Sequence, residues 1–387
     1  MPQRLTARDI LEQLVAFPTV SHDSNLPLIE WVAAYLDEHG IKSYRVPDAT
    51  GLKAALFAQV GPDVQGGVVL SGHTDVVPVE GQAWDTDPFV VTEKDGRLYG
   101  RGTCDMKGFD ALAVWALVEA RDLPLQRPLQ LALSYDEEIG CLAAPDLIRA
   151  MQQALPKADV AIVGEPSMMK VVTGHKGTVG YTVHMKGHEV HSSILHKGVS
   201  AILYGAKLLD WVNSENTRRA AEAPSDMALV FDPPWTTTHV GTIKGGTAHN
   251  ITAKDCVFDI DFRVVPGDSP EACRAAFEAQ VARVAAAMQE VVPETGIDLS
   301  LDFNVPPLVP EQNGAAETLA RRLTGDNSQN VVSFATEGGQ FQEGGYSTVV
   351  CGPGDIAQAH QPNEYISLSQ LEAGQTFMRG LLKDLCP

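Results

Sequence analysis

Imidazole and carboxylate side chains follow several short apolar runs of this sequence. They are His73 and Asp75 after residues 68–70, Glu137 and Glu138 after residues 129–134, Glu165 after residues 160–163, and Asp105 and His360 in glycine-containing loops. Zinc binds histidine nitrogen and carboxylate oxygen, and a catalytic zinc keeps one position open for water. Two zinc ions about 3.5 to 4 Å apart can hold a water and a substrate oxygen side by side. Two imidazoles and at least three carboxylates are the ligand set that such a pair needs.

Each of these motifs, taken alone, has an ordinary structural explanation. A pair such as His73 with Asp75 can cap a turn, and Asp105 stands where an aspartate commonly caps a helix. A run of three acids is typical of solvated surface, and a lone loop histidine such as His360 needs no ligand. The metal interpretation is favoured because these residues follow strands of one predicted domain.

The elements that must position these residues alternate between strand and helix. After helical patterning within residues 5–40, we expect strands at 54–60, 67–70, 129–134 and 160–163, with a helix at 112–119 between two of them. This alternation indicates an α/β domain with a mixed, mostly parallel sheet flanked by helices. Ligands of such sheets bind beyond the carboxyl ends of the strands, which is where the candidate residues lie.

The pattern changes after His175. We expect a strand at 179–185, a helix at 201–211, strands at 239–243 and 255–264, a helix at 270–288 and a strand at 297–303. The order βαββαβ is the ferredoxin-like arrangement. A helix at 315–323 and a strand at 348–351 then resume the first pattern. The sequence therefore predicts a catalytic domain of residues 1–175 and 305–387, interrupted by an inserted α+β domain of residues 176–304.

Composition narrows the function classes. The 387 residues exceed one ordinary core, and 44% hydrophobic with 20% charged residues is typical of globular proteins. A net charge of −20 disfavours nucleic acid and anionic membrane surfaces as partners. We expect no signal peptide and no membrane span. Six cysteines without CxxC spacing favour a reducing cytoplasm over a disulfide framework or a structural zinc knot.

Five stretches resemble one known family. They are SGHTDVVPVEGQAWDTDPF from Ser71, YGRGTCDMKG from Tyr99, SYDEEIGC from Ser134, GEPS from Gly164 and GPGDIAQAHQPNEY from Gly352. In this order they resemble the cocatalytic zinc deacylases and exopeptidases, a family that includes acetylornithine deacetylases, succinyl-diaminopimelate desuccinylases, aminoacylases and glutamate carboxypeptidases. The resemblance spans nearly the whole chain and implies a zinc-exopeptidase-like catalytic domain.

The resemblance implies a role for each candidate of the catalytic domain. Asp105 would bridge two zinc ions, for which cobalt can substitute, with His73 and Glu165 completing one site and Glu138 and His360 the other. Asp75 would hold His73 in the right tautomer. Glu137 would be the general base that takes a proton from the metal-bridging water and passes it to the leaving amine. A cis peptide bond would follow Asp105.

The inserted domain resembles the family's lid and dimerisation domain. The resemblance implies that His191 reaches a neighbouring active site and stabilises the oxyanion, and that Asn250 and Arg263 contact the substrate. A surface ion pair of Arg263 with Asp259 or Asp261 is the ordinary alternative. His188, His191 and His196 could instead form a separate metal site, although no acid or cysteine at ligand spacing joins them.

A further loop, residues 335–339, is expected to border the substrate pocket. It contains Thr336 and Glu337, and we expect Glu337 to meet a cationic side chain of the substrate. An ornithine-like amine would fit this carboxylate, whereas a succinyl group would call for an additional cation.

The leading expectation is a homodimeric, zinc-dependent amidohydrolase that converts N2-acetyl-L-ornithine to L-ornithine and acetate in arginine biosynthesis. Another N-acyl amino acid hydrolase, such as a desuccinylase, is the alternative within the family. A non-catalytic protein that uses metals to hold an amino acid is a more distant one, and it leaves Glu137 without a role. A cysteine hydrolase built on Cys104 is disfavoured because no histidine is assigned to activate the thiol.

Overall fold

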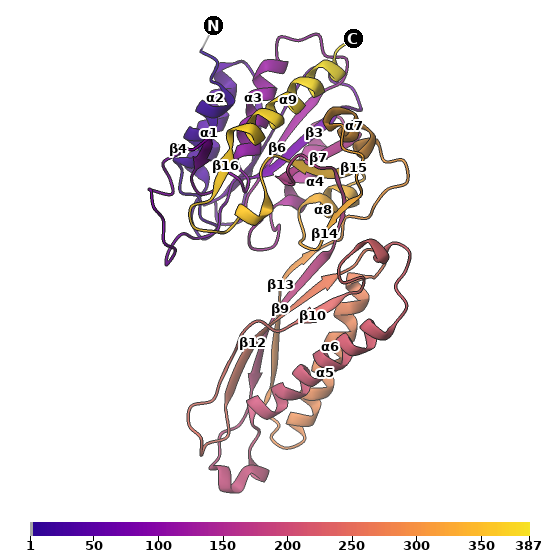
Figure 1. The fold of residues 1–387 in the computed structure, drawn as a ribbon. Helices are drawn as coiled ribbons and strands as arrows, with labels where there is room; N and C mark the ends of the chain where they lie inside the picture. The colour runs from indigo at the N-terminus through magenta and orange to yellow at the C-terminus, as the bar shows by residue number, and fades with distance from the viewer. Residues whose placement is uncertain (1–2) are drawn as a thin grey trace. The chain divides into compact units, whose positions relative to one another are not determined.

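The computed structural model describes residues 3–387, which form two compact units (Figure 1). The first unit comprises the described residues up to Gly174 together with Leu308–Val331 and Thr336–Pro387. The second comprises His175–Pro307 and Val332–Ala335. The chain thus leaves the first unit and returns to it, which makes the second unit an insertion.

An eight-stranded sheet forms the centre of the first unit. Its strands, in spatial order, are β1 (Ser43–Pro47), β2 (Ala54–Val60), β6 (Leu129–Ser134), β3 (Val68–His73), β7 (Val160–Pro166), β15 (Ser347–Gly352), β8 (Val172–His175) and β14 (Asn330–Val332). The four adjacent strands β6, β3, β7 and β15 run parallel. Their carboxyl ends therefore meet at one edge. The predicted α/β class with a mostly parallel mixed sheet is confirmed.

Helices cover this sheet because their apolar residues need a partner surface. They are α1 (Ala7–Val15), α2 (Leu26–Glu38), α3 (Lys107–Ala120), α4 (Ala144–Ala154), α7 (Ala315–Thr324), α8 (Gly338–Glu343) and α9 (Leu368–Leu385). Helix α3 is apolar on nearly every side, and such a helix is buried. It packs against β3 and β6, while α1 and α9 pack on α3. Helix α3, the centre of this packing, begins two residues after Asp105.

A small three-stranded sheet lies beside the large one. It consists of β4 (Thr92–Lys94), β5 (Arg97–Tyr99) and β16 (Tyr365–Ser367), with β5 in the middle. Strands β5 and β16 are antiparallel, and Tyr99 faces Tyr365. The pairing brings the loop before Asp105 next to the segment after His360, although the two are more than 250 residues apart in sequence.

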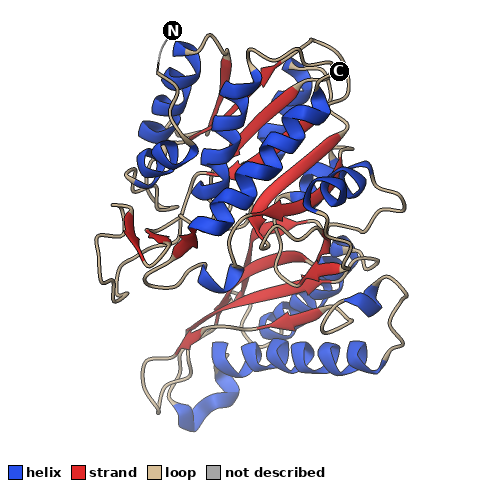
Figure 2. Ribbon diagram, turned by 45° about the horizontal axis from the view of Figure 1, so that its top comes forward, coloured by secondary structure: helices blue, strands red, loops and turns tan. Residues whose placement is uncertain are grey.

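The second unit is a five-stranded antiparallel sheet with two long helices. Its elements are β9 (Gly177–Lys186), α5 (Ala201–Ala221), β10 (Thr237–His239), β11 (Ile243–Gly245), β12 (Asp255–Val264), α6 (Pro270–Gln289) and β13 (Gly296–Val305). Strands β10 and β11 both pair with β12, and β9 and β13 complete the order. Both helices pack on the sheet (Figure 2). The core of this unit includes Phe277. With β10 and β11 counted as one interrupted strand, this is the ferredoxin-like βαββαβ arrangement.

The single strand predicted at residues 239–243 is wrong. His239 faces Asp261 and Ile243 faces Phe258, so three residues of one strand lie opposite two of the other. One extra residue interrupts the pairing as a β-bulge does, and two short strands replace one.

Three short 3-10 helices complete the described structure: Ser192–Lys197, Ala228–Val230 and Ile356–Gln358, labelled η1, η2 and η3. Within residues 3–387, none of the helices has both the length and the apolar character that a bilayer crossing requires.

Candidate metal centre

The end of β3 and the loop after β6 are joined by the carboxylate of Asp75. His73 is the last residue of β3 and faces Ser134, the last residue of β6. Asp75 accepts hydrogen bonds from the backbone N–H groups of Glu137 (3.2 Å) and Glu138 (3.3 Å). The buried hydroxyl of Ser21 donates a third at 2.7 Å. Two adjacent strand ends are thereby fixed to one another.

Asp105 lies between two histidines. Its Oδ1 is 3.1 Å from His73 Nε2, and its Oδ2 is 3.3 Å from His360 Nε2. A carboxylate whose two oxygens face two different imidazoles has the arrangement that a bridging ligand needs. The peptide bond from Asp105 to Met106 is cis, as the family resemblance of the sequence implied.

Each histidine has a second carboxylate of its own. Glu165, from β7, approaches His73 Nε2 with its Oε1 at 3.6 Å. Glu138 approaches His360 Nε2 with its Oε2 at 2.9 Å. The five side chains therefore divide into two sets that share Asp105.

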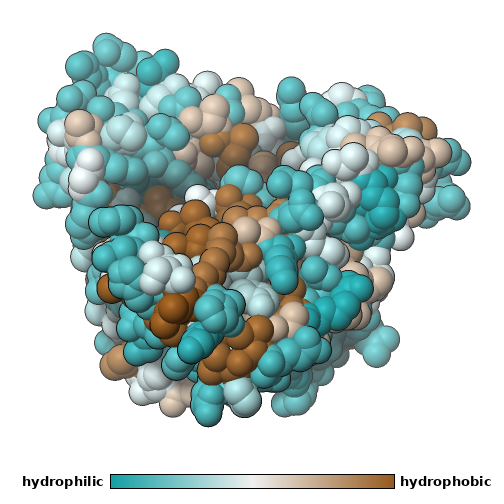
Figure 3. All heavy atoms as spheres, turned by 90° about the horizontal axis from the view of Figure 1, so that it is seen from below, coloured by the Kyte–Doolittle hydropathy of each residue, from teal (hydrophilic) through white to brown (hydrophobic). Residues whose placement is uncertain are grey.

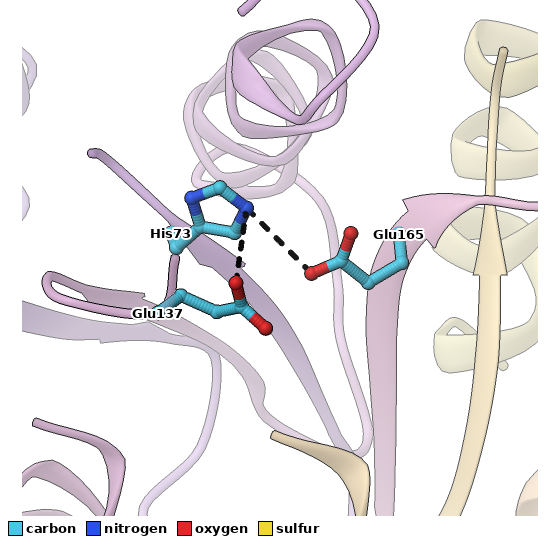
Figure 4. Close-up of side chains that lie close together, drawn as sticks. All are labelled: His73, Glu137 and Glu165. Atoms are coloured by element: carbon cyan, nitrogen blue, oxygen red, sulfur yellow. Dashed lines mark ion pairs between the residues drawn. The ribbon is translucent and has the colours of Figure 1, made fainter. Parts of the chain in front are cut away.

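Glu137 points toward the same ring nitrogen as Glu165, from the loop after β6 (Figure 4). Its Oε2 is 4.0 Å from His73 Nε2. Ligand atoms of His73, Glu137 and Glu165 lie within 4.8 Å of one another, as do those of His73, Asp105 and Glu138. Adjacent glutamates can serve both groups because Asp136, at φ 58°, turns the backbone just before them.

The orientation of the His73 ring is set by Asp75. The backbone carbonyl of Asp75 is 2.9 Å from His73 Nδ1, and its carboxylate Oδ1 is 3.5 Å away. Because a carbonyl oxygen only accepts hydrogen bonds, Nδ1 carries a hydrogen and donates it. Nε2 is therefore the nitrogen that faces the cluster, which is how a metal-binding histidine is commonly oriented.

Burial of so many acids shifts their titration strongly. Burial, together with the nearby Glu138 carboxylate, raises the pKa of Glu137 to about 8. Burial and the charge of Asp105 raise the pKa of Glu138 to about 7 and that of Glu165 well above its usual range. Burial also favours a high pKa for Asp105, but hydrogen bonds to His360 and His73 hold it below its usual value.

The pKa values of the two histidines are raised as well, but here the nearby acids are the cause. Burial favours a low pKa for His73, but hydrogen bonds with Asp105 and Asp75 raise it well above the usual value. Hydrogen bonds with Asp105 and Glu138 raise the pKa of His360 to about 10. The acids thus draw positive charge into this part of the molecule.

These features fit divalent metal ions. Glu165 Oε1 is buried without a hydrogen-bond partner, and a buried carboxylate needs a cationic or hydrogen-bonding partner. Nitrogen from two imidazoles and oxygen from several carboxylates form a donor set that zinc accepts. The site residues therefore suit a pair of metal ions.

Two predicted substrate residues of the first unit are buried. Glu337 is 1% exposed, and the Ser71 hydroxyl donates to its Oε2 at 3.3 Å. Its Oε1 has no hydrogen-bond partner, and burial raises its pKa to about 7. The Thr336 hydroxyl accepts from the backbone N–H of Gly338. Neither side chain forms part of an exposed surface.

Two predicted residues of the second unit are neighbours. The backbone at His191 bridges to Ile251, and the Ser192 N–H donates to the Asn250 carbonyl at 2.9 Å. His191 is exposed, and its Nδ1 contacts the Ser193 hydroxyl at 2.8 Å.

Arg263 forms an ion pair with Asp261, which is the ordinary alternative to a role in substrate binding. Its Nε donates to Asp261 Oδ2 at 2.8 Å, and the pair is partly exposed. His188 and His196 were the other candidates for a separate metal site. Neither belongs to the two groups of His and acidic side chains among residues 3–387 whose ligand atoms lie close enough to hold one ion.

Sequence reasoning missed two buried acids close to the cluster. Asp110, on α3, has two buried carboxylate oxygens without hydrogen-bond partners, and the one available signal was an acid within an apolar helix. Glu364 is buried beside the Asp105 loop. Its position four residues after His360, within one of the recognised motifs, could have indicated it.

Comparison with known proteins gives one consistent answer. Residues 69–384 match the family described as Peptidase family M20/M25/M40. An acetylornithine deacetylase from Myxococcus xanthus is 35% identical, over 98% of this chain and 97% of its own length. Another from Proteus mirabilis (strain HI4320) is 31% identical, over 98% and 96%. The M20 family metallo-carboxypeptidase Sso-CP2 from Sulfolobus solfataricus has the same fold, with a TM-score of 0.79, 18% identity and coverage of 98% and 99%.

Proposed function

Because the chain belongs to Peptidase family M20/M25/M40, we propose that it hydrolyses N2-acetyl-L-ornithine to L-ornithine and acetate. The protein is a metal-dependent hydrolase, and acylated amino acids are its class of substrate. The choice of acetylornithine is supported by the names of relatives that align over nearly the full chain. The observation that carries the mechanism is Asp105, whose two carboxylate oxygens face two different histidines.

The proposed cofactor is a pair of zinc ions, for which cobalt can substitute. His73 and Glu165 would hold one ion, Glu138 and His360 the other, and Asp105 both. When bound, the metals polarise the scissile carbonyl and make water a stronger nucleophile near neutral pH. Asp75 supports this arrangement from outside, because it contacts His73 and also the backbone of Glu137 and Glu138.

Glu137 is the proposed general base. As the water oxygen attacks the amide carbon, one water proton passes to the Glu137 carboxylate. The same proton then moves to the amide nitrogen, so that the C–N bond breaks and a neutral amine leaves. The acid product carries the second water proton and releases it to the free amine or to solvent, so that acetate and L-ornithine are the products and Glu137 is regenerated. The position of Glu137 supports this role. Its Oε2 lies 4.0 Å from His73 Nε2, and Glu137 makes no closer ionic contact with either histidine.

Residues of both units are proposed to recognise the substrate. His191 would donate to the oxyanion, while Asn250 and Arg263 would bind the amino acid portion. Thr336 and Glu337 would complete the pocket. The Glu337 carboxylate suits the side-chain ammonium of ornithine because its Oε1 is otherwise unpartnered.

A homodimer formed through the inserted unit is also proposed, in the cytoplasm. This unit exposes several large apolar side chains: Ile194, Leu195, Ile202, Leu203, Ile243 and Ile251. Figure 3, coloured by residue hydropathy, shows hydrophobic residues in brown gathered among hydrophilic ones on the face seen from below. Contiguous apolar surface of this kind commonly marks a protein interface.

Substrate preference tests the proposed activity. The metal-loaded enzyme should hydrolyse N2-acetyl-L-ornithine with a kcat/KM at least about tenfold above that for N-succinyl-diaminopimelate, a difference of about 1.4 kcal/mol in transition-state binding. The reverse preference would identify a desuccinylase. Metal binding without hydrolysis of any acylated amino acid would instead favour a binding protein.

A further inference from the structure

Glu364 is a buried carboxylate that accepts four hydrogen bonds. Its Oε1 accepts the backbone N–H groups of Cys104 (2.8 Å) and Asp105 (3.0 Å). Its Oε2 accepts the backbone N–H of Gly102 (3.0 Å) and Arg101 Nη1 (2.8 Å). The side chain is completely buried. One acid therefore organises the backbone of the whole loop that ends at Asp105.

The same acid is attached to the segment that carries His360. Only three residues separate Glu364 from His360, and its own backbone carbonyl accepts from the Gly100 N–H at 3.0 Å. The adjacent pairing of Tyr99 with Tyr365 continues this contact. Glu364 thus connects two loops that each provide a proposed metal ligand.

Arg101 extends the connection to the backbone of His360. Its guanidinium, 1% exposed, donates to Glu364, to the Gln361 carbonyl at 3.3 Å and to the Gln82 side chain. Gln82 in turn donates from Nε2 to the His360 carbonyl at 2.9 Å. A chain of hydrogen bonds therefore runs from the Asp105 loop through Glu364, Arg101 and Gln82 to His360.

His360 needs such support more than the other candidate ligands. Its side chain is 54% exposed, whereas the other four are buried or nearly so. Its backbone, at φ 62°, is left-handed, a conformation that costs free energy in a residue other than glycine. Packing alone does not fix this exposed residue, so the hydrogen bonds to its backbone are needed to hold the imidazole near Asp105 and Glu138.

We propose that Glu364 is a positioning residue of the metal centre, which with Arg101 and Gln82 fixes Asp105 and His360 in register. The inference rests on the proposed metal site. A carboxylate is required because all four partners are donors. A carboxamide in its place would turn an NH₂ group toward donors and leave buried N–H groups unsatisfied.

Metal binding by Glu364→Gln tests this role. Apoprotein prepared with a chelator is titrated with Zn²⁺ by calorimetry, and the Co²⁺-loaded protein is examined by visible absorption. Outer partners of metal ligands typically contribute about 10- to 100-fold in metal affinity. We expect a loss of that size for at least one ion, an altered Co²⁺ spectrum, and activity that recovers in excess metal.

Glu311→Gln is the matched control. Glu311 also accepts several hydrogen bonds, from Gln342, Ser347 and the Thr348 N–H. These contacts lie at the start of β15, whereas the proposed metal centre lies at the carboxyl ends of the parallel strands. Its substitution should lower the midpoint of thermal unfolding while both Zn²⁺ affinities and the Co²⁺ spectrum stay as in the wild type. A purely structural role for Glu364 would give this same pattern.

Folded Glu364→Gln with wild-type affinities and spectrum would overturn the inference. If that variant does not fold, Gln82→Ala decides, because Gln82 lies in a partly exposed loop and its loss removes the contact to the His360 carbonyl together with the contacts from Arg101 and Trp84. Weaker binding of one ion by Gln82→Ala supports the proposal, and unchanged binding contradicts it. Wild-type protein that binds no Zn²⁺ would overturn the proposed function itself, which is a separate result.

Discussion

Asp75 shows how much one residue can organise in this centre. It contacts His73 through both a carbonyl and a carboxylate, and the same carboxylate holds the backbone N–H groups of Glu137 and Glu138. A proposed ligand, a proposed base and a second ligand therefore depend on one acid.

The proposed base gives the first prediction. Glu137→Gln should lower kcat by about 10²- to 10⁴-fold, because a carboxamide cannot accept the water proton. Zinc content should stay at the wild-type value, since the five proposed ligands remain. Kinetics with N2-acetyl-L-ornithine and metal analysis of the same sample check this. Glu30→Gln, at an exposed position, is the control, and a fully active Glu137→Gln protein would exclude the assignment.

The clustering of the proposed ligands could be predicted because acids and histidines that recur at the ends of several strands have few ordinary explanations. The residues that hold these side chains in place could not be predicted. Glu364 and Arg101 meet only after β5 and β16 have paired, and these strands are three residues long each. Such short strands give no periodic signal, so the motif that contains Glu364 could indicate the residue but not its contact with Arg101, 263 residues away in sequence.

Close packing of β7 on α3 fixes the position of Glu165 at the level of elements. Gly164 stands directly before Glu165, and a methyl group there would lie 2.0 Å from Phe109 Cγ. Phe109 is itself buried in α3. The strand and the helix can approach this closely only because residue 164 has no side chain.

Gly164→Ala should therefore destabilise the protein by at least about 1 to 3 kcal/mol, the usual cost of overpacking. Urea unfolding of metal-free protein measures this without the contribution of bound zinc. Gly296→Ala is the comparison, because an added methyl group there has no neighbour closer than 3.9 Å. Equal stability of the two variants would show that β7 and α3 adjust to each other freely.

Element prediction succeeded where apolar periodicity was long. The strands at residues 54–60, 129–134 and 255–264 have the predicted bounds. It failed at residues 239–243, where the extra residue opposite β12 depends on pairing with a distant strand. The helix predicted at 201–211 continues to Ala221, where Glu215 forms ion pairs with Arg218 and Arg219 along the helix that apolar periodicity does not detect.

At the scale of the whole molecule, the proposed dimer makes a separate prediction. The wild-type protein should sediment as a dimer, and the double variant Leu203→Arg with Ile251→Arg should sediment as a monomer, because both changes put charge on exposed apolar positions of the inserted unit. Leu52→Arg, at an exposed leucine of the first unit, should leave the dimer intact. A wild-type monomer at micromolar concentration would rule the dimer out.

Subunit mixing tests the proposed role of His191. His191→Ala should lower kcat by about 10²- to 10³-fold, as loss of an oxyanion donor does. If His191 serves the partner's active site, mixing with Glu137→Gln subunits creates one complete site in each hybrid dimer. Activity should then recover to about a quarter of the wild-type value under random exchange. Mixtures as inactive as their components would place His191 in its own chain's site.

The most direct test of the central claim is zinc titration of metal-free protein during turnover of N2-acetyl-L-ornithine. We predict that release of L-ornithine and acetate is absent without metal, rises with added Zn²⁺ and reaches its maximum at two ions per chain, because Asp105 faces two histidines. Full hydrolysis by rigorously metal-free protein, or two bound ions without hydrolysis of any acylated amino acid, would contradict it.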